Sequence, residues 1–466
     1  MKLKFLGAAR EVTGSKHQII TADDKRIILD CGMYQGKGLE TEALNMKLGF
    51  NPQEIDHVIL THAHIDHSGL IPYIYKLGFR GSVICTNATR DLCSIMLADS
   101  GHIQEHDTYY FNKKRARQGL PPVEPIYTRR DAIDCMKLFI GVSYNMKFRI
   151  NENLRVKFTH TGHMLGSAVA NIEIKEGDHT HRIAYTGDIG RPVNRILMPP
   201  LEFPQADFLI TESTYGDRLH TDNINAEKEL LDVIYHTCVE KGGKLIIPSF
   251  SVGRTQDIVY SLNNFYNEGR LPKIDIYVDS PLAINATDIF RLHPECFNSN
   301  ILEIMERDPD PFGFNRLFYI KSVDDSKKLN RIKKPAVIIS ASGMMEAGRV
   351  KHHLANSISD SKNTVLAVGY CAPSTLGARI LRGDQAVSIH GNMYPVRADI
   401  KRIDSYSGHG DYREMADFLS CQDPQKIQQT FLVHGEYESQ TVYKEYLEKK
   451  GFRNIHIPDV GTEYTL

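Results

Sequence analysis

The sequence Thr-His-Ala-His-Ile-Asp-His at residues 61–67 follows directly on the apolar run His-Val-Ile-Leu at residues 57–60. The run predicts a short buried strand, and the residues after it predict a loop at the end of that strand. Three histidines and an aspartate lie within six positions of this loop, where alternate side chains point to opposite sides. Imidazole and carboxylate groups are ligands that zinc accepts, so the stretch predicts a site for a pair of metal ions.

Three further candidate ligands lie at predicted strand ends beside glycine: His163 in TGHMLGSA, Asp188 in YTGDIG and His434 in LVHGE. Taken singly, each is ordinary turn chemistry. With the first cluster they make five histidines and two aspartates, enough for two zinc ions with a shared carboxylate. Solvent held between two metal ions is a hydroxide at neutral pH, so the chemistry implied is hydrolysis.

The chain has 466 residues, of which 41% are hydrophobic and 24% are charged, a composition that indicates a compact globular protein of more than one domain. Disordered and fibrous classes are excluded. Short strands fill the first part, strands alternate with helices after Pro204, and the pattern changes again near Arg402. We expect an α/β protein with domains at 1–205, 206–399 and 400–466, in which the last piece completes the first domain.

The 56 basic residues nearly balance the 57 acidic ones, so binding of a polyanion would need a local basic surface. Most charge runs are solvated faces, but those lining a groove would follow a nucleic-acid backbone. The basic candidates are KKRAR at 113–117, Arg129 with Arg130, Arg379 with Arg382, and Lys401 with Arg402.

The N-terminal segment MKLKFLGAAREVTG is interrupted too early by charge to predict a signal peptide, and no stretch approaches 18 apolar residues. We therefore expect a cytoplasmic protein with no membrane partner. The eight cysteines form no CxxC pair, which argues against a disulfide framework and against a thiolate zinc site.

Residues 62–67 match in full the H-x-H-x-D-H motif of the metallo-β-lactamase superfamily, which this sequence resembles. The resemblance implies an αββα sandwich. It also implies two Zn²⁺ per chain, with His62, His64 and His163 on one, Asp66, His67 and His434 on the other, and Asp188 bridging them. Asp30, in ILDCG, matches the first acidic motif of the family, which is implied to orient a ligand.

The segment expected at 206–399 resembles the β-CASP domain of the nucleic-acid-processing branch, an inserted domain with a parallel βα sheet. The match to this branch extends over nearly the whole chain, in the stretches TESTYG (211–216), IPSFSVGRTQ (247–256), VDSPLA (278–283), SASGMMEAGR (340–349), TLGARIL (375–381) and SGHGD (407–411). Glu212, His409 and His434 match the three positions that define this branch. A histidine at the third position marks the RNA-acting members, so single-stranded RNA is the expected substrate.

The resemblance implies a zinc-dependent ribonuclease. A hydroxide bridging the zinc ions and positioned by Asp66 would attack phosphorus in line. His409, whose ordinary pKa lies near working pH, would protonate the departing 3′ oxygen with the support of Glu212. Endonuclease and 5′-to-3′ exonuclease action remain open, because both use the same metal core.

Five positions resemble phosphate contacts of the family: Ser407, Gly408, Ser342, Gly343 and Thr375. A homodimer is a further expectation from the resemblance. Residues 102–106 also match H-x-x-E-H, an inverted zinc-protease motif. Because a complete set of ligands already exists, we expect those histidines to support the site or line a substrate channel.

Three alternatives remain. A thioester or lactam hydrolase would use the same zinc ions but gives no role to the inserted domain, Glu212 or His409. A DNA-directed nuclease is disfavoured by His434. A non-catalytic RNA-processing subunit is disfavoured because all seven ligand positions are filled.

Overall fold

The computed structural model describes residues 1–36, 40–220, 226–369, 371–372, 374–403 and 408–466. The chain forms two compact units. Unit 1 combines both ends of the chain, Met1–Leu219 and Gly408–Leu466, and unit 2 is the segment between them, His220–Ser407.

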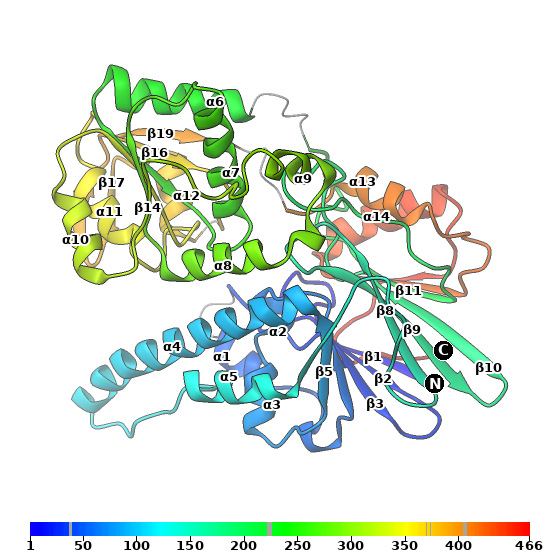
Figure 1. Ribbon diagram of the computed structural model, residues 1–466. Coiled ribbons are helices and arrows are strands. Elements are labelled where there is room, and N and C mark those ends of the chain that lie inside the picture. The colour runs from blue at the N-terminus through cyan, green and yellow to red at the C-terminus, as the bar shows by residue number, and fades with distance from the viewer. Residues whose placement is uncertain (37–39, 221–225, 370, 373, 404–407) are drawn as a thin grey trace. The chain divides into compact units, whose positions relative to one another are not determined.

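Unit 1 contains two seven-stranded sheets (Figure 1). The first has the order β22-β1-β2-β3-β4-β5-β6. Its strands are β1 Lys2–Gly7, β2 Lys16–Ile20, β3 Arg26–Leu29, β4 His57–Ile59, β5 Ser82–Thr86, β6 Phe139–Val142 and β22 Glu463–Thr465. The second has the order β21-β20-β11-β10-β9-β8-β7. Its strands are β7 Phe148–Arg149, β8 Leu154–His160, β9 Ala168–Glu176, β10 His179–Tyr185, β11 Phe208–Glu212, β20 Gln429–Val433 and β21 Ile455–His456.

The main core of unit 1 lies between the two sheets. Phe5, Ile27 and Ile59 of the first sheet are buried in one cluster with Phe158 and Phe431 of the second. The strands β3, β4, β5 and β6 are parallel, and their continuous apolar runs match the burial of both faces of such a sheet.

Helices cover the outer faces of both sheets. Those that follow strands of the first sheet are α1 Thr41–Met46, α2 Ile65–Ser68, α3 Ile71–Lys76, α4 Asn87–Arg117 and α5 Arg129–Cys135. The second sheet packs its outer face on α13 Tyr412–Leu419 and α14 Tyr437–Lys449, where Leu209 and Leu432 meet Met415 and Leu447. Unit 1 is thus an αββα sandwich, and the predicted fold class is confirmed.

Unit 2 is built on a six-stranded sheet with the order β14-β13-β15-β12-β16-β19, in which every pairing is parallel. Its strands are β12 Lys244–Pro248, β13 Asp275–Val278, β14 Leu317–Tyr319, β15 Ala336–Ser340, β16 Thr364–Ala367 and β19 Asp399–Arg402, and β17 Ala386–Ile389 pairs with β18 Asn392–Pro395. The helices are α6 Ala226–Ile234, α7 Arg254–Asn267, α8 Pro281–Leu292, α9 Ser299–Met305, α10 Val323–Arg331, α11 Val350–Ser357 and α12 Leu376–Arg382. This is the expected parallel βα arrangement.

The unit boundaries differ from the expected ones at 205/206 and 399/400. Strand β11 pairs in parallel with β10 and β20, so the residues up to Leu219 belong to unit 1. Strand β19 pairs with β16, so the chain stays in unit 2 beyond residue 400. Both unit boundaries follow from the hydrogen bonds between strands. The change of sequence pattern near Pro204 does not coincide with either boundary.

Two expectations about the whole chain can be compared with the structure. All eight cysteines are unpaired, and six of them are buried. Within the described ranges, the helices include none of the length and apolar character that crossing a bilayer requires.

Candidate metal centre

The predicted ligands of unit 1 come together at one edge of its two sheets. All but His409 lie at or just after the carboxyl end of a strand, and parallel strands deliver such ends to the same edge. Asp30 follows β3, the stretch 62–67 follows β4 and continues into α2, and His163 lies between β8 and β9. Asp188 follows β10, Glu212 ends β11, His434 follows β20, and His409 precedes α13.

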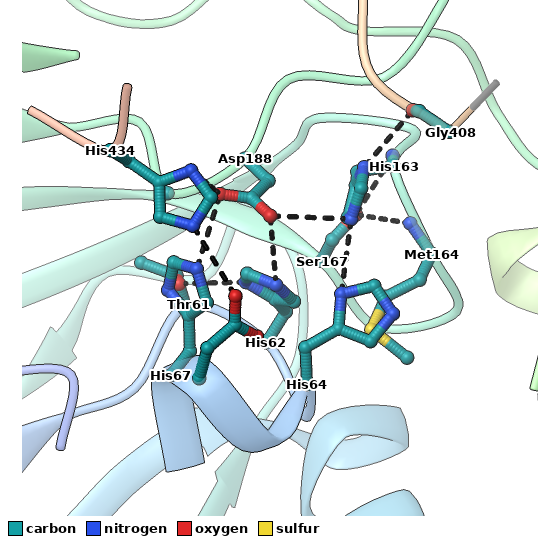
Figure 2. Close-up of polar contacts among 12 residues, drawn as sticks. Thr61, His62, His64, His67, His163, Met164, Ser167, Asp188, Gly408 and His434 are labelled. Atoms are coloured by element: carbon teal, nitrogen blue, oxygen red, sulfur yellow. Dashed lines mark hydrogen bonds and ion pairs between the residues drawn. The ribbon is translucent and has the colours of Figure 1, made fainter. Parts of the chain in front are cut away.

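Within the described residues, these side chains form groups whose ligand atoms lie within 4.8 Å of one another. One group contains His62, His64, His163 and Asp188, and another contains Asp66, His67 and His434. Asp188 also groups with His434 and Glu212, so its carboxylate stands between the two sets (Figure 2). The seven ligands expected from the sequence are therefore neighbours.

Among the described residues, four of the five histidines predicted as ligands are held by hydrogen bonds from Nδ1 to acceptors within the protein. Nδ1 of His67 donates to Asp30 Oδ2 over 2.6 Å, and Nδ1 of His163 donates to the Gly408 carbonyl over 3.0 Å. The Thr61 hydroxyl donates to Asp30 and so accepts from His62 Nδ1 at 3.0 Å. The Thr214 hydroxyl likewise donates to the His434 carbonyl and accepts from Nδ1 of the same histidine.

These hydrogen bonds leave the lone pair on Nε2 of each ring. The Nε2 atoms of His62, His67 and His434 are buried without a hydrogen-bond partner among the described residues, and so is Oδ1 of Asp188. Nε2 of His62 lies 3.3 Å from Asp188 Oδ2, and Nε2 of His67 lies 3.2 Å from Asp188 Oδ1. Buried lone pairs that face a carboxylate repel unless a cation lies between them, so this donor set fits metal ions.

The ionisation of the cluster agrees with that fit. Burial lowers the pKa of His64 to about 3 and the pKa of His163 well below its usual value, so both rings are neutral. Burial opposes the charge of His67, but Asp188 and Asp30 outweigh it and raise the pKa of that ring well above its usual value, because the two carboxylates favour a cation on Nε2, either a proton or a metal ion. Burial likewise opposes ionisation of Asp188, but His434, His67 and His62 hold its pKa well below the ordinary range. The carboxylates require positive charge at this point, which a metal ion can supply.

Backbone geometry brings the motif loop close to the strand β3. Asp30 and His434 have positive φ angles of 54° and 52°, values that non-glycine residues rarely adopt. A Cβ at Gly32 would lie 1.6 Å from the Asp66 carbonyl oxygen, so only glycine permits this approach. The unfavourable backbone conformations therefore occur at the predicted ligand His434 and at Asp30, which orients the ligands.

Asp30 lies beneath the ligands and contacts no solvent. Its Oδ1 accepts from the Thr61 backbone N–H, and its Oδ2 accepts from Thr61, His67 and the Tyr185 hydroxyl. It thus holds His67 directly and His62 through Thr61.

His409 and Glu212 lie beside the ligand cluster. Nδ1 of His409 is 3.1 Å from both carboxylate oxygens of the buried Glu212, which also accepts from the Ile189 backbone N–H. Nε2 of His409 is 4.0 Å from Asp188 Oδ2, so this atom faces the ligands. Burial opposes the charge of His409, but Glu212 outweighs it and raises the pKa of the imidazole to about 9.

Of the predicted phosphate contacts, Gly408 lies beside this cluster in unit 1, and three others belong to unit 2. Ser407 lies outside the described residues, and Gly408 is present as the acceptor for His163. Ser342, Gly343 and Thr375 belong to unit 2. Thr375 caps α12, where its hydroxyl accepts from the Ala378 N–H and donates to the Ala372 carbonyl.

The motif H-x-x-E-H lies in the middle of α4. His102 and His106 are exposed, and neither joins a group of three possible ligands within the described chain.

Some supporting residues were missed in the sequence analysis. Thr61, Thr214 and Tyr185 fix ligands or Asp30, and the Ser167 hydroxyl accepts the N–H groups of His163 and Met164 (Figure 2). Three of the four stand inside motifs quoted above, TESTYG, YTGDIG and TGHMLGSA, and Thr61 opens the metal motif. The sequence therefore shows that these residues stand close to predicted ligands in the chain, but their hydrogen-bond partners depend on the fold.

Three family models match the chain. They are the metallo-beta-lactamase superfamily over residues 19–92, the Beta-Casp domain over 255–380, and the Zn-dependent metallo-hydrolase RNA specificity domain over 393–458.

Curated relatives match nearly the whole chain. Ribonuclease TTHA0252 of Thermus thermophilus is 34% identical over 452 residues, which cover 97% of each protein. The RNase J-like protein of Methanocaldococcus jannaschii is 33% identical over 94% of this chain and 93% of its own length. Transcription termination factor FttA of the same organism is 32% identical over 94% of this chain and 67% of its own length. The chain therefore belongs to the β-CASP ribonuclease group of the metallo-β-lactamase superfamily.

Proposed function

We propose that this protein is a zinc-dependent ribonuclease that hydrolyses phosphodiester bonds of single-stranded RNA. One observation carries the proposal: His409, hydrogen-bonded to Glu212, stands beside a buried set of ligand atoms that have no hydrogen-bond partner among the described residues. This arrangement combines a metal site with a proton donor, the two elements that phosphodiester hydrolysis requires.

Two zinc ions are the metals we assign to the centre. His62, His64 and His163 would hold one, Asp66, His67 and His434 would hold the other, and Asp188 would contact both. The histidine-rich set with carboxylates suits zinc, which prefers nitrogen ligands more than magnesium or calcium does. When bound, the pair would supply an acidified solvent molecule and positive charge for the phosphate.

Asp66 is assigned the role of orienting the attacking solvent. Burial opposes its ionisation, but His434 and His67 outweigh this and keep the pKa of the Asp66 carboxyl below its usual value. Its Oδ2 lies 3.5 Å from Nε2 of His434. The group is therefore an ionised acceptor at working pH, which can hold a solvent proton. Asp30 is assigned to positioning His67.

His409 is assigned as the general acid. Its Nδ1 is committed to Glu212, so the proton available for transfer is the one on Nε2, which faces the ligands. The raised pKa keeps this proton in place at neutral pH. Delivery of the proton to the 3′ oxygen makes that oxygen a better leaving group, since an alkoxide leaves poorly.

RNA is the substrate we favour over DNA and over small esters or lactams. The match to an RNA specificity domain and the relatives named as ribonuclease and RNase J-like support RNA. A small-molecule hydrolase would give no role to unit 2, which matches the Beta-Casp domain. The complete ligand set speaks against a non-catalytic subunit.

Several finer expectations stay predictions. These are the phosphate contacts of Ser407, Gly408, Ser342, Gly343 and Thr375, the homodimer and the cytoplasmic location. Sedimentation velocity of the zinc-loaded protein would test the homodimer.

The test of the proposed function is a cleavage time course of zinc-loaded protein on end-labelled single-stranded RNA and DNA of the same sequence. We expect RNA-selective cleavage and two zinc ions per chain. Asp66→Ala protein should be inactive, and Asp178→Ala, which changes an exposed turn, should match the wild type. Protein with two zinc ions that cleaves neither polymer, or cleaves both equally, would refute the proposal.

A further inference from the structure

The 31-residue helix α4 begins beside the turn that carries the predicted ligand His163 and extends away from it. The hydroxyls of Thr86 and Thr89, at the start of the helix, donate to the Gly166 carbonyl over 2.7 and 2.9 Å. Gly166 lies in the turn that carries His163. Figure 1 shows the far end of α4 reaching beyond α3 and α5.

The last third of α4 presents one face of rings and cations, which we call the aromatic–basic face. Positions 106, 110, 113 and 117 share one side of a helix, and positions 109 and 114 flank them. The residues of this face are His106, Tyr109, Tyr110, Lys113, Lys114 and Arg117.

The rings of this face are open to solvent. Tyr109 is 56% exposed and Tyr110 is 52% exposed, and their centroids lie 5.4 Å apart. The His106 ring lies 4.7 Å from that of Tyr110. Clustered exposed rings of this kind mark a surface that contacts another molecule.

The cations of the face lie among these rings. Nζ of Lys113 is 4.4 Å from the Tyr109 ring centre and 5.5 Å from that of Tyr110. Lys113, Lys114 and Arg117 form no ion pair within the described residues, and the nearby Asp107 lies 3.6 Å from His106 Nδ1. The face therefore carries net positive charge that no ion pair among the described residues neutralises.

The opposite side of the same helix is braced by the chain that follows it. Asn112 exchanges two hydrogen bonds of 2.9 Å with the backbone of Val123, and Arg115 Nε donates to the Pro121 carbonyl over 2.7 Å. Positions 112 and 115 lie across the helix from the aromatic–basic face. The returning chain thus holds the helix end in place and leaves the face uncovered.

We propose that the aromatic–basic face binds single-stranded RNA at a distance from the cleaved bond, with bases stacked on Tyr109 and Tyr110 and phosphates paired with Lys113, Lys114 and Arg117. Alternating rings and cations complement a strand that alternates bases and phosphates, and stacking on tyrosine needs no particular base. This inference rests on the proposed function, because it assigns a second contact to the same substrate.

The length of the helix sets which substrates can use the face. His106 stands 19 residues after Asn87, or about 30 Å along the axis at 1.5 Å per residue. An RNA that reaches from the metal centre to the face must span that distance, so a tetranucleotide is too short and a 30-nucleotide strand is long enough.

The test compares the full-length zinc-loaded wild type with two variants, Tyr109→Ala/Tyr110→Ala and Lys113→Gln/Lys114→Gln/Arg117→Gln. A third variant, Lys449→Gln/Lys450→Gln/Arg453→Gln, removes the same charge from exposed positions in and after α14 and serves as the control. Cleavage of a 30-nucleotide oligouridylate and of tetrauridylate is measured for each protein, and fluorescence anisotropy measures binding of the labelled 30-nucleotide strand at several salt concentrations.

For the long strand we expect KM to rise at least about fivefold in both face variants, with kcat unchanged. KM for tetrauridylate should stay at the wild-type value, and so should every parameter of the control. Loss of the three cations should reduce the slope of log Kd against log salt by about 2.

Unchanged binding of the long strand, or an equal loss for both lengths, would overturn the proposal. So would a change in sedimentation of the face variants, which would identify the face as a contact between protein chains. If the wild type cleaves neither RNA, the proposed function fails, and the anisotropy series still decides whether the face binds RNA.

Discussion

Nδ1 of His67 lies 2.6 Å from Oδ2 of Asp30, a carboxylate that no solvent reaches. The same oxygen accepts from the hydroxyls of Thr61 and Tyr185. Asp30 therefore fixes which nitrogen of His67 carries the proton, and with it the direction of the Nε2 lone pair.

Replacement of that carboxylate should weaken metal binding. Oδ2 of Asp30 accepts from the hydroxyls of Thr61 and Tyr185 and from the imidazole N–H of His67. In Asp30→Asn one carboxylate oxygen becomes an NH₂ group, which donates and cannot accept, so at least one of the present donors loses its acceptor. We expect zinc affinity to fall about 10- to 100-fold, as measured by competition with a chromogenic chelator. The control is Asp178→Asn. Affinity equal to that of the wild type would show that Asp30 does not orient His67.

Loss of the general acid should separate catalysis from metal content. His409→Ala removes the proton donor but none of the seven proposed ligands, so we expect kcat on RNA to fall about 10²- to 10⁴-fold. Zinc content by mass spectrometry of the metal should stay at the wild-type value, and His179→Ala, at an exposed strand end, should change neither quantity. A loss of one zinc ion per chain would make His409 a ligand instead.

The pH dependence of cleavage should report the pair His409 and Glu212. A general acid acts in its protonated form, so the rate should fall as pH rises through the pKa of His409, which Glu212 raises. Glu212→Gln removes the negative charge, so the pKa should fall and the alkaline limb of the rate profile should move to lower pH. Glu202→Gln, an exposed change, should leave the profile in place. If the alkaline limb does not move, Glu212 does not control the pKa of the proton donor.

Unit 2 has a buried ionic network whose loss should be visible as reduced stability. Asp279 is fully buried and accepts from Arg349 at 2.6 Å, His353 at 2.7 Å and Ser326 at 2.6 Å. Asp279→Asn leaves Arg349 without its buried counter-charge, and we expect a loss of about 3 kcal/mol. The midpoint of urea unfolding by circular dichroism measures it. Asp324→Asn, which alters an exposed pair with Lys327, should have little effect.

The same network predicts the effect of acid. Burial opposes ionisation of Asp279, but His353, Ser326 and Arg349 outweigh it and lower the pKa of the carboxyl. Its contribution to stability is therefore complete above its unfolded pKa near 4 and is lost as pH falls through the lower folded value. Wild type and Asp279→Asn should approach the same unfolding midpoint only at that acidic end. A constant difference across the pH range would contradict this assignment.

The sequence alone was sufficient for the parts of the fold and site that depend on neighbouring residues. His62, His64, Asp66 and His67 lie within six positions after an apolar run, so a strand end brings them together whatever the rest of the chain does. Apolar runs alternating with helices likewise predicted the parallel sheet of unit 2, because burial of both sheet faces leaves that pattern in the sequence.

Only the tertiary structure determined the unit boundaries and the hydrogen-bond partners of the ligands, because both depend on segments that are distant in sequence. Whether β11 and β19 belong to one unit or the other follows from their hydrogen-bonded neighbours, and a strand pattern carries no information about its partners. The acceptors that orient the ligands have the same origin: Thr214 meets His434 across 220 residues, and Gly408 meets His163 across 245. The basic run at 113–117 was visible in the sequence, but its grouping with two exposed tyrosines on one helix face required the folded helix, because exposure depends on which side the returning chain covers.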